Sequence, residues 1–339
     1  MILHPAIIAL FLSSLLMVVL IVYAAWYGIR VLRNWDITSG SDLQLVLERR
    51  TYLISIILTY VFAFELLSLF LFIYTADHLH TLFIGAMCAA GTLKVNDYGY
   101  PTLLFKVGNF IEAGLWLIMN HADNQAHDYP LIKKKYLLLL IITPTILMEV
   151  FLQTKYFLLL RPRVLTSCCG TIFRPSGNTL SGDLAALPPI PMEIAFYVIL
   201  AVNIATALYF YLKNKGGFLF GVLSLAQFII SVAAVVSFIS PYFYELPTHH
   251  CPFCILQGHY GYIGYPLYTA LFGSVVTGTG VGMLSPFKNI ESLSKTLPPF
   301  LKKLALVSIV LTIAFLALVT YRILSTDFIL QSWKSVTPA

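Results

Sequence analysis

The 339-residue sequence has few charged side chains, only 11% of the total, whereas soluble domains carry about 25%. Hydrophobic residues make up 59% of the chain, and apolar runs of about 20 residues recur along its whole length. These properties exclude an ordinary soluble protein. The 21 basic residues separate apolar runs and form no basic surface stripe, so we expect a lipid bilayer as the environment and no nucleic acid partner.

Each apolar run is long enough to cross a hydrocarbon core of roughly 30 Å as a helix. We therefore predict an all-α polytopic membrane protein with about eight transmembrane helices. The predicted spans cover residues 6–29, 52–75, 101–120, 136–157, 192–212, 217–240, 265–285 and 304–324. Within the seventh of these, Gly278 and Gly282 are spaced for close packing against another helix.

Basic residues orient the spans, because cytoplasmic loops of membrane proteins are enriched in Lys and Arg. The connections after spans one, three, five and seven hold 13 of the 21 basic residues, so we place those loops inside and both termini outside. The outer loops contain no Asn-x-Ser/Thr acceptor, which leaves no reason to invoke a secretory pathway. We predict the plasma (inner) membrane of a prokaryote.

Cysteine is scarce, and five residues are too few for a disulfide-dense scaffold. All five fall in predicted outer loops, on the side of the membrane where disulfides persist. They are Cys88, Cys168, Cys169, Cys251 and Cys254. The loop around Cys88, near residues 78–98, is apolar but too short to span, and we expect a re-entrant or interfacial segment there. The Pro-rich loop 161–191 is expected to be an irregular cap.

The pair Cys251-Pro-Phe-Cys254 allows three interpretations. A structural disulfide would close too short a loop to stabilise the fold much. A metal site could use His249, His250, Cys251 and Cys254, with His259 in reserve, although three adjacent donors cannot easily all face one ion. A redox pair fits best if the motif opens a helical turn, with Pro252 at its first position and His249 or His250 stabilising a thiolate.

The segment CPFCILQ resembles the cysteine motif of the DsbB family of disulfide-generating membrane oxidoreductases. The order from span four to span seven also resembles the four-helix unit of vitamin K epoxide reductases. The resemblance covers about 150 residues and implies a quinone acceptor, with the cysteines as the redox centre. Gly258 stands where DsbB-like proteins have an Arg that contacts the quinone, and Cys168 and Cys169 are adjacent, whereas the family's loop cysteines are spaced apart.

Three glutamates lie inside predicted spans, where ionisable groups are costly and usually functional. These are Glu65, Glu112 and Glu149, which we predict as a proton relay. Glu112 is favoured because Lys106 and Asn109 lie on roughly the same helical face. In the alternative, Lys106 pairs with one glutamate and burial keeps the others neutral.

We divide the chain into an N-terminal three-helix region (1–130), an oxidoreductase-like core (131–290) and a C-terminal helix and tail (291–339). The leading hypothesis is a thiol-disulfide oxidoreductase that passes electrons from an extracytoplasmic thiol protein or small molecule, through Cys251 and Cys254, to a lipid-soluble quinone. Cys88, Cys168 and Cys169 would form an exchange relay. The alternatives are a protein that binds or transports a metal ion or haem, and a non-catalytic subunit associated with other membrane subunits of a respiratory-type complex.

Overall fold

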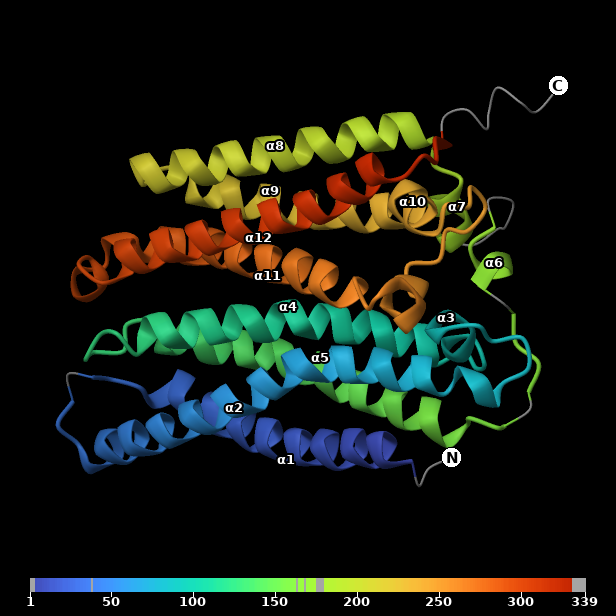
Figure 1. Ribbon diagram of the computed structural model, residues 1–339. Helices are drawn as coiled ribbons and strands as arrows, with labels where there is room; N and C mark the ends of the chain where they lie inside the picture. The colour runs from blue at the N-terminus through green and yellow to red at the C-terminus, as the bar shows by residue number, and fades with distance from the viewer. Residues whose placement is uncertain (1–3, 38, 163, 168, 175–179, 331–339) are drawn as a thin grey trace. The chain divides into compact units, whose positions relative to one another are not determined.

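The computed structural model of the protein describes residues 4–37, 39–162, 164–167, 169–174 and 180–330. Within these residues the chain is helical and forms no β-strand, apart from one isolated parallel bridge between Ile84 and Leu165. Eight helices in the described part are long and apolar enough to cross a membrane. Each predicted span lies inside one of them, which confirms the all-α multi-pass architecture (Figure 1).

The chain folds into two compact units, each assembled from segments that are distant in sequence. The first unit consists of Met1–Thr75, Asn96–Pro162 and Pro286–Leu301; the second consists of Ala76–Val95, Arg163–Ser285 and Lys302–Ala339. Two of the boundaries between the units fall inside continuous helices: one after Thr75 in α2 (Asp42–His78), and one after Leu301 in α12 (Leu297–Ser325). The regions predicted from the sequence follow chain order, so the two units divide the chain at other points.

The first unit is built on α1 (Pro5–Asn34), α2, α4 (Gly99–Asp123) and α5 (Ile132–Leu158). Helix α5 packs against both α1 and α4. Gly28 permits a close approach in α1, because a Cβ there would lie 2.7 Å from the Tyr136 ring of α5. Aromatic and aliphatic side chains fill the core of this unit, and the rings of Phe62 and Trp116 lie 4.9 Å apart between their centres.

Helix α2 begins ten residues before the predicted span. The charged residues Glu48, Arg49 and Arg50 come just before the apolar run. The helix nevertheless includes them, because Leu47 and Gln44 on the same helix are buried. The Tyr27 hydroxyl of α1 also contacts the Val46 carbonyl at 3.5 Å. Packing of one helical face therefore extends α2 past the stretch that hydropathy alone identifies.

A buried ion pair fixes the connection between α4 and α5. The Lys135 ammonium lies 2.7 Å from the Asp123 carboxylate and donates to the Asn120 side chain at 3.1 Å. The other Asp123 oxygen accepts a hydrogen bond from the Leu131 backbone N–H at 2.8 Å. Lys135, which belongs to a basic cluster in the sequence, is thus a structural residue and only 1% exposed.

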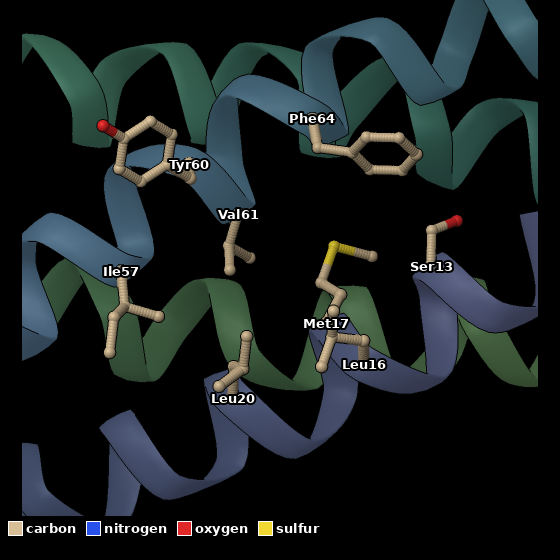
Figure 2. A pocket seen from close by; sticks show the side chains of 8 residues that line it. All are labelled: Ser13, Leu16, Met17, Leu20, Ile57, Tyr60, Val61 and Phe64. Atoms are coloured by element: carbon tan, nitrogen blue, oxygen red, sulfur yellow. The ribbon is translucent and has the colours of Figure 1, made fainter.

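An apolar cavity of about 350 Å³ opens between α1 and α2. Figure 2 shows Met17 and Leu20 of α1 pointing across it toward Val61 and Phe64 of α2. Because its lining is almost wholly hydrocarbon, this cavity suits an acyl or isoprenoid chain better than a polar ligand.

The second unit contains α8 (Pro189–Lys213), α9 (Gly217–Ala234), α10 (Ser240–Tyr244), α11 (Gly264–Leu284) and most of α12. A π-helical turn, η2 (Val235–Ile239), joins α9 to α10. Helices α9 and α11 pack closely, since a Cβ on Gly282 would lie 2.7 Å from the Gly221 Cα. The predicted packing role of the small residues in α11 is therefore confirmed.

We expect Gly282→Ala to destabilise the second unit. Its methyl group would meet the backbone of Gly221, which cannot rotate away, so a loss of about 1–3 kcal/mol is expected. Thermal unfolding in detergent would measure this loss. Gly108→Ala in α4 is the matched control, because nothing lies within 4 Å of a Cβ at that position. Equal melting temperatures for the two variants would contradict the packing argument.

Candidate functional site: a buried thiol cluster

The two cysteines of the CPFC motif lie in the loop between α10 and α11. Cys254 begins a short 3₁₀ turn, η3 (Cys254–Leu256), and a second turn, η4 (Gly258–Tyr260), follows. Helix α11 begins only at Gly264, ten residues after Cys254. The expectation that the motif opens a helical turn with Pro252 first is wrong, because the turn begins at Cys254 and leaves Cys251 in the irregular loop before it.

Two tyrosines, of which Tyr244 is buried and Tyr268 is half-buried, hold the backbone of this motif. The Tyr244 hydroxyl donates to the Cys251 carbonyl at 2.5 Å and accepts from the Ile255 N–H at 2.9 Å. The Tyr268 hydroxyl of α11 donates to the Pro252 carbonyl at 2.5 Å. These bonds replace the backbone pairing that a regular helix would supply, so the positions of both thiols are set by side chains outside the motif.

Cys88 reaches the motif from the loop after α2. It immediately precedes α3 (Ala89–Leu93), a short helix whose residues are all buried. The Asp77 carboxylate accepts from the Ala89 N–H at 3.1 Å and also from the Gln257 amide at 3.0 Å. The same Gln257 amide donates to the Met87 carbonyl at 2.9 Å. Gln257 therefore ties the residue before Cys88 to the loop that carries Cys251 and Cys254.

The result is a cluster of three thiols, which we call the thiol cluster. The Sγ atoms of Cys88, Cys251 and Cys254 all lie within 4.8 Å of one another, and those of Cys88 and Cys251 are 3.5 Å apart. All three side chains are buried, with at most 5% exposed. A disulfide has an S–S length of about 2.05 Å, so these sulfurs are in contact without being bonded.

Among the candidate histidines, His249 faces the thiol cluster. Its Nε2 lies 3.4 Å from the Cys254 Sγ, and its ring packs edge-on against Tyr244. His259 is exposed and lines a separate cavity of this unit. Of the donors in the alternative metal set, the structure thus brings His249, Cys251 and Cys254 together, and it adds Cys88.

His250 has a different contact. Its Nδ1 lies 2.9 Å from the carbonyl oxygen of Val236, inside the π-helical turn η2. Such turns leave carbonyl groups without their usual helical partners. Burial lowers the pKa of His250, because the protonated form loses its hydration, while hydrogen bonds to backbone carbonyls oppose the shift. A neutral His250 therefore anchors the loop to the end of α9.

The vicinal cysteines belong to the neighbouring loop. Cys168 lies outside the described residues, and the backbone of Cys169 begins the short helix α6 (Cys169–Ile172), which packs against α3. Just before them, the Thr166 N–H donates to the Ile84 carbonyl at 3.0 Å, and the Thr166 hydroxyl donates to the Gly91 carbonyl at 2.9 Å. The loops that carry Cys88 and Cys169 are therefore joined through their backbones at one end of this unit (Figure 1).

The predicted relay residues lie in the first unit. The Lys106 ammonium is 2.5 Å from Glu149 Oε1, which confirms the alternative in which Lys106 pairs with a glutamate. Asn109 donates to Glu149 as well, so the two residues expected beside Glu112 both bind Glu149. Glu112 instead accepts a hydrogen bond from the Thr145 hydroxyl at 2.9 Å, because it points to another part of α5.

Comparison with protein-family models, curated proteins and solved structures finds no significant match for this chain. The function is therefore inferred from the geometry of the thiol cluster. Sequence reasoning missed Asp77, Tyr244 and Tyr268, and it used Gln257 only as part of a motif. A polar residue at the end of a span, as Asp77 is, was the one available signal.

We expect Gln257→Leu to loosen Cys88 from Cys251. The change removes two hydrogen bonds and leaves the Asp77 carboxylate and the Met87 carbonyl short of a donor, which costs about 1–3 kcal/mol. Oxidative cross-linking of Cys88 to Cys251, followed by peptide mass spectrometry, should become slower. Gln125→Leu, in the α4–α5 connection, is the control and should cross-link at the wild-type rate. Unchanged cross-linking in Gln257→Leu would show that Gln257 does not position Cys88.

Proposed function

We propose that this protein is a multi-pass membrane thiol-disulfide oxidoreductase whose redox centre is the thiol cluster. The observation that carries the proposal is the convergence of three buried thiols from two loops to within 4.8 Å. Two thiols suffice to form a disulfide. A third sulfur within reach allows that bond to be exchanged within the protein, through attack of a thiolate on a disulfide sulfur.

Cys251 is the natural centre of this exchange, because its sulfur lies 3.5 Å from that of Cys88 and shares a C-x-x-C motif with Cys254. When Cys251 and Cys254 are bridged, the Cys88 thiolate attacks the Cys251 sulfur, and Cys254 leaves as a thiolate. His249, 3.4 Å from that sulfur, is placed to supply a proton to it. One S–S bond forms as one breaks, so this internal step transfers no net electrons.

The net reaction needs an electron donor and an acceptor. The proposed donor is an extracytoplasmic dithiol, which becomes a disulfide as the cluster is reduced to thiols. The proposed acceptor is a lipid-soluble quinone, which takes two electrons and two protons to become a quinol while the cluster disulfide is restored. The proposed relationship to DsbB-like and vitamin K epoxide reductase-like proteins rests on the CPFCILQ segment and on the order of the spans.

A cavity of about 440 Å³ in the second unit supports a flat aromatic acceptor. Its lining includes Phe243, His259, Tyr260 and Arg322. The Tyr260 ring packs against Tyr244, with 4.9 Å between ring centres, and Tyr244 holds the Cys251 carbonyl. Aromatic faces would stack on a quinone ring, and the histidine and guanidinium N–H groups would donate to its oxygens.

The proposed location follows from the distribution of basic residues. Lys and Arg in the connections after spans one, three, five and seven favour a cytoplasmic position for those loops. The thiol cluster and both termini would then lie on the outer side of a prokaryotic plasma membrane, with residues 78–98 at the interface. Disulfides persist in that compartment, as the proposed chemistry requires.

Binding of a soft metal ion is the second candidate, and one observation favours it. His249 adds a nitrogen donor next to the three sulfurs, which gives the Cys₃His donor set found in zinc sites. Cu(I) is equally suited to thiolate ligands. In that case the cluster would hold the ion and would not cycle between thiols and a disulfide.

Thiol mapping together with metal analysis of the purified protein separates the two candidates. We expect a reducible disulfide within the thiol cluster and no stoichiometric metal. The electron pathway also predicts that Cys251→Ser abolishes quinone reduction by a dithiol. A mapping result of three alkylatable thiols with one equivalent of zinc or copper would refute the oxidoreductase and establish the metal site.

Single Cys→Ser variants supply the matched controls. Cys254→Ser should still oxidise to a Cys88–Cys251 bridge, and Cys88→Ser should still oxidise to a Cys251–Cys254 bridge, because each retains the central sulfur. Cys251→Ser should oxidise most slowly. Equal oxidation rates in all three variants would contradict the central position of Cys251.

A further inference from the structure

A second polar cluster, independent of the thiols, lies inside the first unit. Lys106 of α4 lies 2.5 Å from Glu149 Oε1 of α5 and donates to the Ser68 hydroxyl of α2 at 3.1 Å. The Asn109 amide donates to the other oxygen of Glu149, and Ser68 donates to Glu65 Oε2 at 3.0 Å. Three helices of the unit therefore direct polar side chains to one point.

The charges at this point do not balance. Glu65 and Glu149 are both fully buried, and Lys106 is 1% exposed, so two carboxyl groups face a single ammonium. The titratable groups that act on Glu65 are Glu149 and Lys106. With all three ionised, one negative charge would remain uncompensated in a low-dielectric interior, which costs several kcal/mol. One additional cation is needed to neutralise the cluster.

The hydrogen bonding leaves a place for that cation. Within the described residues, Glu65 Oε1 has no donor, and Asn109 Oδ1 also lacks one. Glu65 and Glu149 meet around Ser68 and Lys106, since Ser68 donates to Glu65 and accepts from the Lys106 ammonium that pairs with Glu149. A carboxyl group can act as a donor only when it is protonated. A proton on Glu65 supplies the positive charge that the cluster lacks, and it also supplies a hydrogen-bond donor beside the unpartnered oxygen atoms.

We propose that Glu65 and Glu149 form a carboxyl-carboxylate pair that binds one exchangeable proton, while Lys106 neutralises the remaining negative charge. This is a binding site for a proton within the membrane-spanning part of the chain, and it does not depend on the chemistry of the thiols. Breaking the pair or removing the ammonium changes the number of protons that the cluster holds.

A cavity gives the pair a route to its surroundings. About 320 Å³ in volume, it is lined by Leu104, Phe105, Gly108, Asn109, Glu112 and Thr145. Asn109 belongs to both the cavity wall and the buried cluster, since its amide bonds Glu149. Glu112, half-buried in the wall, is the titratable group through which a proton would pass between the cavity and the pair.

Infrared spectroscopy of the full-length protein in lipid nanodiscs would count the protonated carboxyl groups directly. We expect Glu65→Gln to remove one carboxylic-acid C=O band at neutral pH. Glu149→Gln should also remove it, because Glu65 would then ionise and pair with Lys106. Lys106→Met should add a second band, because neither carboxylate would keep its counter-ion. Glu112→Gln is the matched control and should retain the band lost in Glu65→Gln.

The route is tested by the rate at which that band shifts after transfer into D₂O. Glu112→Gln should slow the exchange by roughly a hundredfold if Glu112 carries the proton. Glu65→Gln and Glu149→Gln are isosteric, so they test the site even if Lys106→Met fails to fold. A Glu65→Gln spectrum identical to that of the wild type, or a band that survives in Glu149→Gln, would overturn the site. An unchanged exchange rate in Glu112→Gln would overturn the route.

Discussion

The thiol cluster depends on the hydrogen bonds that Gln257 donates to Asp77 and to the Met87 carbonyl. These bonds join two loops that are 170 residues apart in sequence, and closing such a loop carries an entropic cost that local contacts do not repay. Asp77 also holds the first turn of α3, so a single carboxylate fixes both the orientation of Cys88 and its distance from the CPFC motif. Without this link, Cys88 would lose the bonds that hold it beside the loop carrying Cys251 and Cys254.

Polar groups inside the two units serve different purposes. In the second unit, Asn203, Gln227 and Ser224 form a neutral network that joins α8 to α9, and Gln227 extends it to Ser274 of α11. Each of these groups finds a partner and leaves no net charge, as expected of polar contacts that bind helices together. The Lys106 cluster of the first unit instead contains an odd number of ionisable groups. Neutral amides would serve packing as well, so the excess carboxyl group needs another explanation, and proton binding provides it.

The sequence predicts the helices well because a bilayer requires about 20 apolar residues in every span. It predicts the contacts between helices poorly, and Glu112 illustrates the reason. Lys106, Asn109 and Glu112 do share a face of α4, but helical spacing does not reveal which residues of α5 lie opposite each turn. Glu149 meets the first two, and Thr145, one turn away, meets the third. A residue's own helix gives its direction, whereas its partner is fixed only by the register of the neighbouring helix.

The conformations of loops are still harder to predict from sequence, because they are set by side chains that lie outside any motif. The CPFC backbone is held by Tyr244 and Tyr268, and His250 binds it to the π-helical turn at the end of α9. Each anchor is buried or contacts a buried group, so exposing the thiols would break several hydrogen bonds together. A large protein partner would have to meet that cost to reach any of the three sulfurs. The burial of the cluster therefore requires local opening of the loop for the proposed dithiol partner, whereas the proposed quinone would bind in the existing cavity lined by Tyr260.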